Sequence, residues 1–161
     1  MSGWTFSRMT QAEAEQIATW RYPGEYAFYD ADFFGDDLAE LLDPDRRGDE
    51  YWSAVGDGTL EGFVQLKPAV GGAVEIGLGL RPGLTGRGLG GAFVAAVVAL
   101  ARAGGARRIV LAVAAFNLRA IRVYERAGFV ETGRHVRRLA GRDWEFVDMA
   151  LEPGTVPERI A

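Results

Sequence analysis

The chain has 161 residues, no cysteine and a formal net charge of −4, with 48% apolar and 25% charged residues. This length and composition are typical of one soluble globular domain, and the lack of cysteine excludes disulfides, thiolate metal sites and a cysteine nucleophile. One histidine, and three serines outside any G-x-S-x-G pattern, argue against a serine hydrolase and a multi-histidine metal site. The longest apolar stretch, residues 91–101, is too short to cross a bilayer, and no secretory signal precedes it, so we expect a cytoplasmic protein.

Charge is divided unevenly along the chain. Residues 1–75 carry 15 acidic and 5 basic side chains, whereas residues 76–161 carry 7 acidic and 13 basic ones. The basic part favours an anionic ligand and the acidic part a cationic one. A chance distribution of surface charge explains the asymmetry equally well.

The first half of the chain is predicted to begin with a short strand at residues 4–8 and a helix at 11–20. Thr10 and Glu13 form the capping box that starts this helix. An aromatic and acidic segment follows, then a short helix at 36–42 and a turn over 43–48. Residues 50–55, 60–66 and 73–80 alternate as three strands joined by glycine turns.

The second half is predicted to alternate helices with strands. Residues 89–103 are apolar nearly all round, which predicts a buried helix. The following segments predict a buried strand at 108–114, a helix at 117–127 and a final hairpin from 129–137 and 143–151. The interpretation is one α/β domain with a mixed sheet.

A glycine-rich turn at residues 80–91 connects a predicted strand to a predicted helix. Its backbone N–H groups and the helix N-terminus favour an anion, most often a phosphate. Gly86, Gly88 and Gly91 also match the G-x-G-x-x-G dinucleotide pattern. That pattern needs an acidic residue about 20 positions later, and residues 107–117 contain none, so the dinucleotide interpretation is rejected. A turn without a ligand remains the alternative.

Two motifs in register resemble those of the GCN5-related N-acetyltransferases. Thr85-Gly86-Arg87-Gly88-Leu89-Gly90 resembles motif A, Gln/Arg-x-x-Gly-x-Gly/Ala. The run from Asn117 to Phe129 looks like the family's N-x-x-A-x-x-x-Y-x-x-x-G-F signature. The resemblance covers roughly residues 4–152. Thr85 departs from the pattern, and we expect its hydroxyl to donate to the cofactor in place of the usual arginine or glutamine.

The resemblance implies a single GNAT-like α/β (α+β) domain at residues 1–152 and a C-terminal tail at 153–161. Its mostly antiparallel mixed sheet would have about seven strands flanked by about four helices. The implied activity is transfer of an acetyl group from acetyl-CoA, without a metal, to a primary amine of a small molecule in a ternary complex. A protein N-terminus or lysine as acceptor, and a non-catalytic acyl-CoA-binding regulatory module, are the alternatives.

The resemblance also assigns roles to residues. Cofactor contacts are expected from Leu78, Leu80, Thr85, Gly86, Arg87, Gly88, Leu89, Gly90 and Asn117. Tyr124 would protonate the departing thiolate, although its place on an apolar stripe also suits a core residue.

Glu75 would be the general base, with Glu25, Asp30 and Asp32 as rivals and a structural pair with an arginine as the alternative. Trp20, Tyr22 and Tyr26 would contact the acceptor, because aromatic rings beside acids suit a cation. His135 is expected to have no role. The arginine-rich stretch 134–142 is typical of a solvated hairpin, so nucleic acid is not expected as a partner, and a homodimer is left open.

Overall fold

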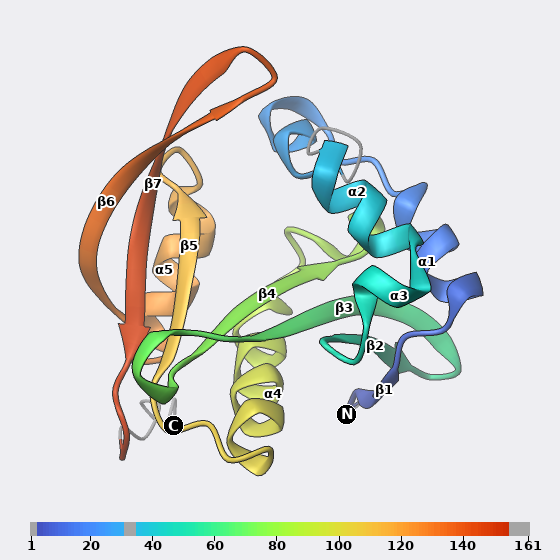
Figure 1. Cartoon of the computed structure of the whole chain (residues 1–161), viewed down its shortest axis with the longest axis horizontal. Coiled ribbons are helices and arrows are strands. Elements are labelled where there is room, and N and C mark those ends of the chain that lie inside the picture. The colour runs from blue at the N-terminus through green and yellow to red at the C-terminus, as the bar shows by residue number, and fades with distance from the viewer. Residues whose placement is uncertain (1–2, 31–34, 155–161) are drawn as a thin grey trace. The chain divides into compact units, whose positions relative to one another are not determined.

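A computed structural model describes residues 3–30 and 35–154 of the chain (Figure 1). The strands are β1 (Thr5–Arg8), β2 (Tyr51–Gly56), β3 (Thr59–Pro68), β4 (Val74–Leu80), β5 (Ile109–Ala114), β6 (Val130–Leu139) and β7 (Arg142–Leu151). The α-helices are α1 (Gln11–Ala18), α2 (Gly35–Leu42), α3 (Pro44–Arg47), α4 (Gly90–Ala103) and α5 (Leu118–Arg126). Short 3-10 helices are η1 (Gly24–Tyr29), η3 (Val70–Gly72) and η4 (Pro82–Leu84).

The strands form a seven-stranded sheet in the order β1-β2-β3-β4-β5-β7-β6. β4 and β5 run parallel, whereas the pairs β1–β2, β2–β3, β5–β7 and β6–β7 are antiparallel. This mixed, mostly antiparallel α/β sheet confirms the predicted fold class. In the described part of the chain, no helix is long and apolar enough to cross a membrane.

The chain divides into two compact units. The first unit comprises Met1–Gln65 and Leu78–Thr85, and the second comprises Leu66–Gly77 and Gly86–Ala161. The predicted tail at 153–161 lies almost wholly outside the described residues.

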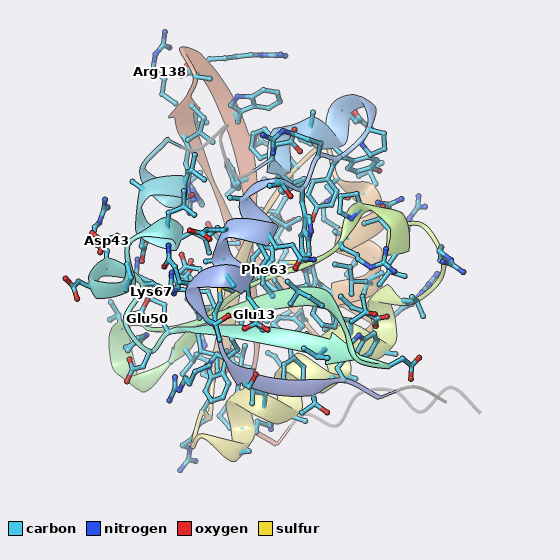
Figure 2. The ribbon with its side chains drawn as sticks, turned by 90° about the vertical axis from the view of Figure 1, so that its right-hand side faces the viewer. Glu13, Asp43, Glu50, Phe63, Lys67 and Arg138 are labelled. Carbon is cyan, nitrogen blue, oxygen red and sulfur yellow. The ribbon has the colours of Figure 1, made fainter. Side chains whose placement is uncertain are left out.

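The first unit is organised around α1. The predicted capping box is present, because the Thr10 hydroxyl accepts from the Glu13 N–H at 3.1 Å and the Glu13 carboxylate accepts from the Thr10 N–H at 2.9 Å. Figure 2 shows Glu13 at the start of this helix and Phe63 on β3. Apolar side chains of α1, α2 and the first strands form one core: Met9, Ala14, Ile17, Trp20, Leu41, Tyr51 and Leu60.

One predicted turn of the first unit is instead a helix. Residues 44–47 form α3 because the Asp43 carboxylate caps the Asp45 N–H at 3.0 Å and Pro44 occupies the first helical position. Proline is favoured there because its missing N–H would have no partner within the helix anyway. The two local signals outweigh the loop-like composition of the segment.

The second unit has one thoroughly buried sheet face. Ile109, Leu111 and Val113 of β5 are at most 5% exposed, as are Val147, Met149 and Leu151 of β7. The prediction that α4 is buried all round is wrong. Phe93, Val94, Val97, Val98 and Ala101 are buried, whereas Ala92, Ala95 and Ala99 are exposed. Alanine suits an exposed helix face because of its high helix propensity, so hydropathy alone misjudges this helix.

The β6–β7 hairpin of the second unit carries its arginines in local pairs. Arg134 bonds to Glu131 and Glu145, and Arg138, near the far end of the hairpin in Figure 2, bonds to Asp143. This pairing is what the interpretation of residues 134–142 as a solvated hairpin predicts.

Candidate active site

The glycine-rich turn leads into α4 without any side-chain cap on the helix. Gly86 and Gly88 adopt φ values of 73° and 77°, a left-handed conformation that side chains disfavour. No side chain caps the N-terminus of α4, its first turn holds no acidic residue, and a Cβ at Gly88 or Gly91 would meet nothing within 4 Å. A helix N-terminus with open space in front of it suits a bound anion. Exposed Arg87 adds a positive charge and makes no ion pair with any described residue.

Thr85 uses its hydroxyl proton inside the turn. Its Oγ1 donates to the carbonyl of Pro82 at 2.9 Å, and its backbone N–H points to the same oxygen at 3.3 Å. The phosphate oxygens of a cofactor are acceptors and need a donor. The hydroxyl proton of Thr85 is therefore used within the turn, and its contact with the cofactor stays a prediction.

Asn117 caps α5, the helix that carries the second motif. Its side-chain Oδ1 accepts from the Ala120 N–H at 3.1 Å, and the residue is 9% exposed. An asparagine at this position satisfies a backbone donor that would otherwise lack a partner. The sequence-predicted cofactor residue therefore also has a structural role.

The ring of Tyr124 is held by its own motif. Gly128, with φ of 102°, ends α5 and turns the chain so that the Phe129 N–H donates to the Tyr124 carbonyl at 3.0 Å. The two rings then pack edge to face with centroids 5.8 Å apart, and Phe129 is 2% exposed. Tyr124 itself is half-buried. The Y-x-x-x-G-F spacing thus builds a rigid support under the phenol.

Glu75 lies on a half-open sheet face of the second unit. It pairs with Val110 on β5, and Ala112, two residues along β5, pairs with Asp148 on β7. Paired residues share a face and alternate residues return to it, so both carboxylates are on one face. Strand spacing places their Cα atoms roughly 12 Å apart. No arginine among the described residues pairs with Glu75, so the structural alternative has no support.

The sequence reasoning missed Asp148 and its partners. His135 Nδ1 lies 3.0 Å from Asp148 Oδ2, and the Arg137 Nε–H donates to His135 Nε2 at 3.0 Å. His135 also stacks on Phe146, with centroids 5.5 Å apart. The two ring nitrogens of His135 thus lie between the Asp148 carboxylate and the Arg137 guanidinium group. Alternation along β6 puts His135 and Arg137 on the same face of that strand. Only the strand register shows that Asp148 shares a face with Glu75.

In the first unit, the predicted acceptor residues have different surroundings. The Tyr22 hydroxyl donates to the Leu80 carbonyl at 2.7 Å, and the Tyr22 N–H donates to the Asp30 carboxylate at 2.8 Å. Burial, and secondarily the charge of Asp30, raise the pKa of Tyr22 well above its usual value. Trp20 is 9% exposed in the hydrophobic core, packed against Phe63. It therefore supports the segment from within.

The other predicted site residues differ in their exposure. Tyr26 is half-buried in η1 and Glu25 is exposed beside it, while Leu78 is half-buried on β4. Asp32 lies outside the described residues. Asp30, a rival base, accepts a hydrogen bond from the Tyr22 N–H.

Comparison with known proteins decides between the interpretations. The sequence matches the acetyltransferase (GNAT) family over residues 11–129, about three quarters of the chain. The chain belongs to the GNAT family of acetyltransferases. The match includes both motifs, so the predicted membership is confirmed. No curated protein sequence matches the chain significantly.

Solved structures share the GNAT fold with this acetyltransferase. A spermidine N-acetyltransferase chimera from Vibrio cholerae and hSSAT aligns with a TM-score of 0.74 and 21% identity, covering 92% of this chain and 95% of that one. The aminoglycoside acetyltransferase AAC(6′)-Ib in complex with coenzyme A gives 0.71 and 24%, covering 93% and 95%. A GNAT-family acetyltransferase from Bacillus anthracis gives 0.74 and 15%, covering 94% and 96%.

Family membership confirms acetyl-CoA as the expected co-substrate of this GNAT protein. The uncapped, glycine-lined start of α4 fits its diphosphate. In the described ranges, no group of three histidine, aspartate or glutamate side chains is arranged to hold a metal ion.

Proposed function

We propose that this GNAT protein is an N-acetyltransferase that acts on a primary amine of a small cationic molecule. The observation that carries the proposal is the pair of half-buried carboxylates, Glu75 and Asp148, on one face of the sheet in the second unit. Carboxylates on a partly desolvated surface attract an ammonium group. The spermidine and aminoglycoside acetyltransferases that share the fold have amines as the substrates named for them, which is consistent with this assignment.

Glu75 is proposed as the group that removes a proton from the acceptor. An amine with a pKa near ~10.4 is less than about 0.1% neutral at pH 7, a deficit of roughly 4–5 kcal/mol. A positioned base contributes about 10²–10⁴-fold, which offsets most of that deficit. Glu75 suits this role because no arginine of the described residues neutralises it.

Tyr124 is proposed as the acid on the opposite side of the reaction. Acetyl-CoA supplies a thioester whose carbonyl carbon bonds to the amine nitrogen as the carbon–sulfur bond breaks. Glu75 holds the first proton of the ammonium group until solvent removes it. The Tyr124 hydroxyl gives its proton to the departing sulfur, and the second nitrogen proton, which is lost as the amide forms, restores the phenol. The chain has no cysteine to accept the acetyl group, which favours direct transfer in a ternary complex.

An acceptor screen followed by release of free coenzyme A tests the proposal. The panel contains diamines and polyamines, aminoglycosides, a neutral alcohol and peptides with a free N-terminus or lysine. Small cationic amines should give the highest kcat/KM. Turnover confined to peptides would mean that the acceptor is a protein N-terminus or lysine. Binding of acetyl-CoA with no turnover on any acceptor would favour a regulatory module.

A further inference from the structure

An arginine on α5 lies against the glycine-rich turn. Arg119 is the second residue of α5 and is exposed. A Cβ atom built on Gly86 would lie 3.3 Å from its Nη1 atom, so the guanidinium group approaches the backbone of Gly86 closely. A Cβ at this position would make a tight contact with the guanidinium group, and the φ of 73° at Gly86 favours glycine.

The same turn lacks an outward donor one residue earlier. Thr85 donates its hydroxyl proton to the Pro82 carbonyl at 2.9 Å. A diphosphate at the start of α4 would therefore receive backbone N–H groups and the helix dipole, but no hydrogen bond from the Thr85 hydroxyl. Its two negative charges call for a cation within reach of the turn.

We propose that Arg119 binds the diphosphate of acetyl-CoA and supplies the charge-assisted contact that Thr85 does not. This inference rests on the proposed function, since it assumes that acetyl-CoA binds at the turn. A guanidinium group presents paired donors that match phosphate oxygens, and it stays charged at every physiological pH. Residues 76–124 contain no acidic residue, so the turn and the start of α5 carry no carboxylate, and Glu125 lies at the far end of α5.

The closeness of Arg119 to Gly86 also fixes which part of the cofactor it would contact. α4 begins four residues after Gly86, and a Cβ at Gly88, between the two, would meet nothing within 4 Å. The part of the cofactor nearest the backbone of Gly86 would be the anion bound by the N–H groups of the turn and of the start of α4. The inference therefore assigns Arg119 to the diphosphate rather than to a phosphate elsewhere on the cofactor.

Binding of a ligand series by calorimetry tests the assignment. Coenzyme A and its 3′-dephospho form both keep the diphosphate, whereas pantetheine lacks it. Arg119→Gln should weaken the first two equally, by about 10- to 100-fold, and leave pantetheine unchanged. Arg126→Gln, at the other end of α5, is the matched control and should change none of them.

A second variant keeps the test independent of folding. Adding Thr85→Arg to Arg119→Gln places a guanidinium group on the neighbouring side of Gly86 and should recover most of the lost affinity. Equal affinities for Arg119→Gln and the unchanged protein would overturn the inference, and so would a loss seen with coenzyme A but not with its dephospho form. If the unchanged protein bound neither of these ligands, the proposed function itself would fail.

Discussion

The hydroxyl of Tyr22 donates a 2.7 Å hydrogen bond to the backbone carbonyl of Leu80, 58 residues further along the chain. Tyr22 was predicted to contact the acceptor and Leu80 to contact the cofactor. Within the first unit, the bond ties the aromatic segment to the end of β4, and Asp30 holds the same segment through the Tyr22 N–H. We infer that Tyr22 first of all positions this segment.

Tyr22→Phe should therefore reduce stability. The substitution removes the donor to a buried residue, since Leu80 is 9% exposed, and a lost hydrogen bond of this kind costs about 1 kcal/mol. Urea unfolding followed by tryptophan fluorescence measures the change. An unaltered free energy of unfolding would show that water replaces the phenol without cost.

The protein should lose stability at alkaline pH. Burial is the main cause that raises the pKa of both Tyr22 and Tyr51, and nearby carboxylates add to it. The unfolded chain releases these phenolic protons near pH ~10 while the folded chain retains them. The contribution of the two tyrosines to stability is therefore constant below about pH 10 and falls above it. Melting temperatures from pH 8 to 11.5 should show this fall, with a smaller slope for Tyr22→Phe or Tyr51→Phe. A slope unaffected by both variants would contradict the assignment.

Glu75→Gln should lower kcat/KM by about 10²–10⁴-fold at neutral pH. The defect should shrink as the pH rises, because an amine that is already neutral needs no base. A pH profile of both proteins measures the ratio, with Glu125→Gln on the exposed side of α5 as control. A ratio that stays flat from pH 6 to 10 would mean that another group removes the proton.

Tyr124→Phe should lower kcat and leave the affinity for acetyl-CoA nearly intact. The substitution removes the hydroxyl group and keeps the ring that packs on Phe129, and general acids contribute about 10²-fold or more. Steady-state kinetics and calorimetry separate the two quantities. Tyr124→Leu, which also removes the ring contact, should in addition reduce stability. Full turnover in Tyr124→Phe would exclude the acid role.

Asp148→Asn should raise the KM for a cationic acceptor by about 3- to 10-fold with little change in kcat. The carboxylate is half-exposed, which keeps the effect modest. Glu145→Gln, three residues away on the opposite face of β7, is the matched control. If the two variants raised KM equally, the effect would come from net charge and not from the face that Glu75 shares.

Local patterns were sufficient for most of the fold and for both motifs. Capping at Thr10, glycine turns and hydrophobic alternation predicted the elements of the sheet to within a few residues, because each depends on neighbours in the chain. The errors have the same origin. Asp43 and Pro44 start a helix where composition favoured a turn. The exposed face of α4 consists largely of alanine, so hydropathy did not distinguish it from the buried face.

The contacts that give each residue its task depend on pairs that are far apart in the sequence. No local pattern reveals that Asp148 shares a face with Glu75, because this follows from the register of three strands. The approach of Arg119 to Gly86 is of the same kind, since it depends on where α5 lies beside the turn. Sequence periodicity reports which side of an element a residue occupies, whereas packing decides what lies opposite it.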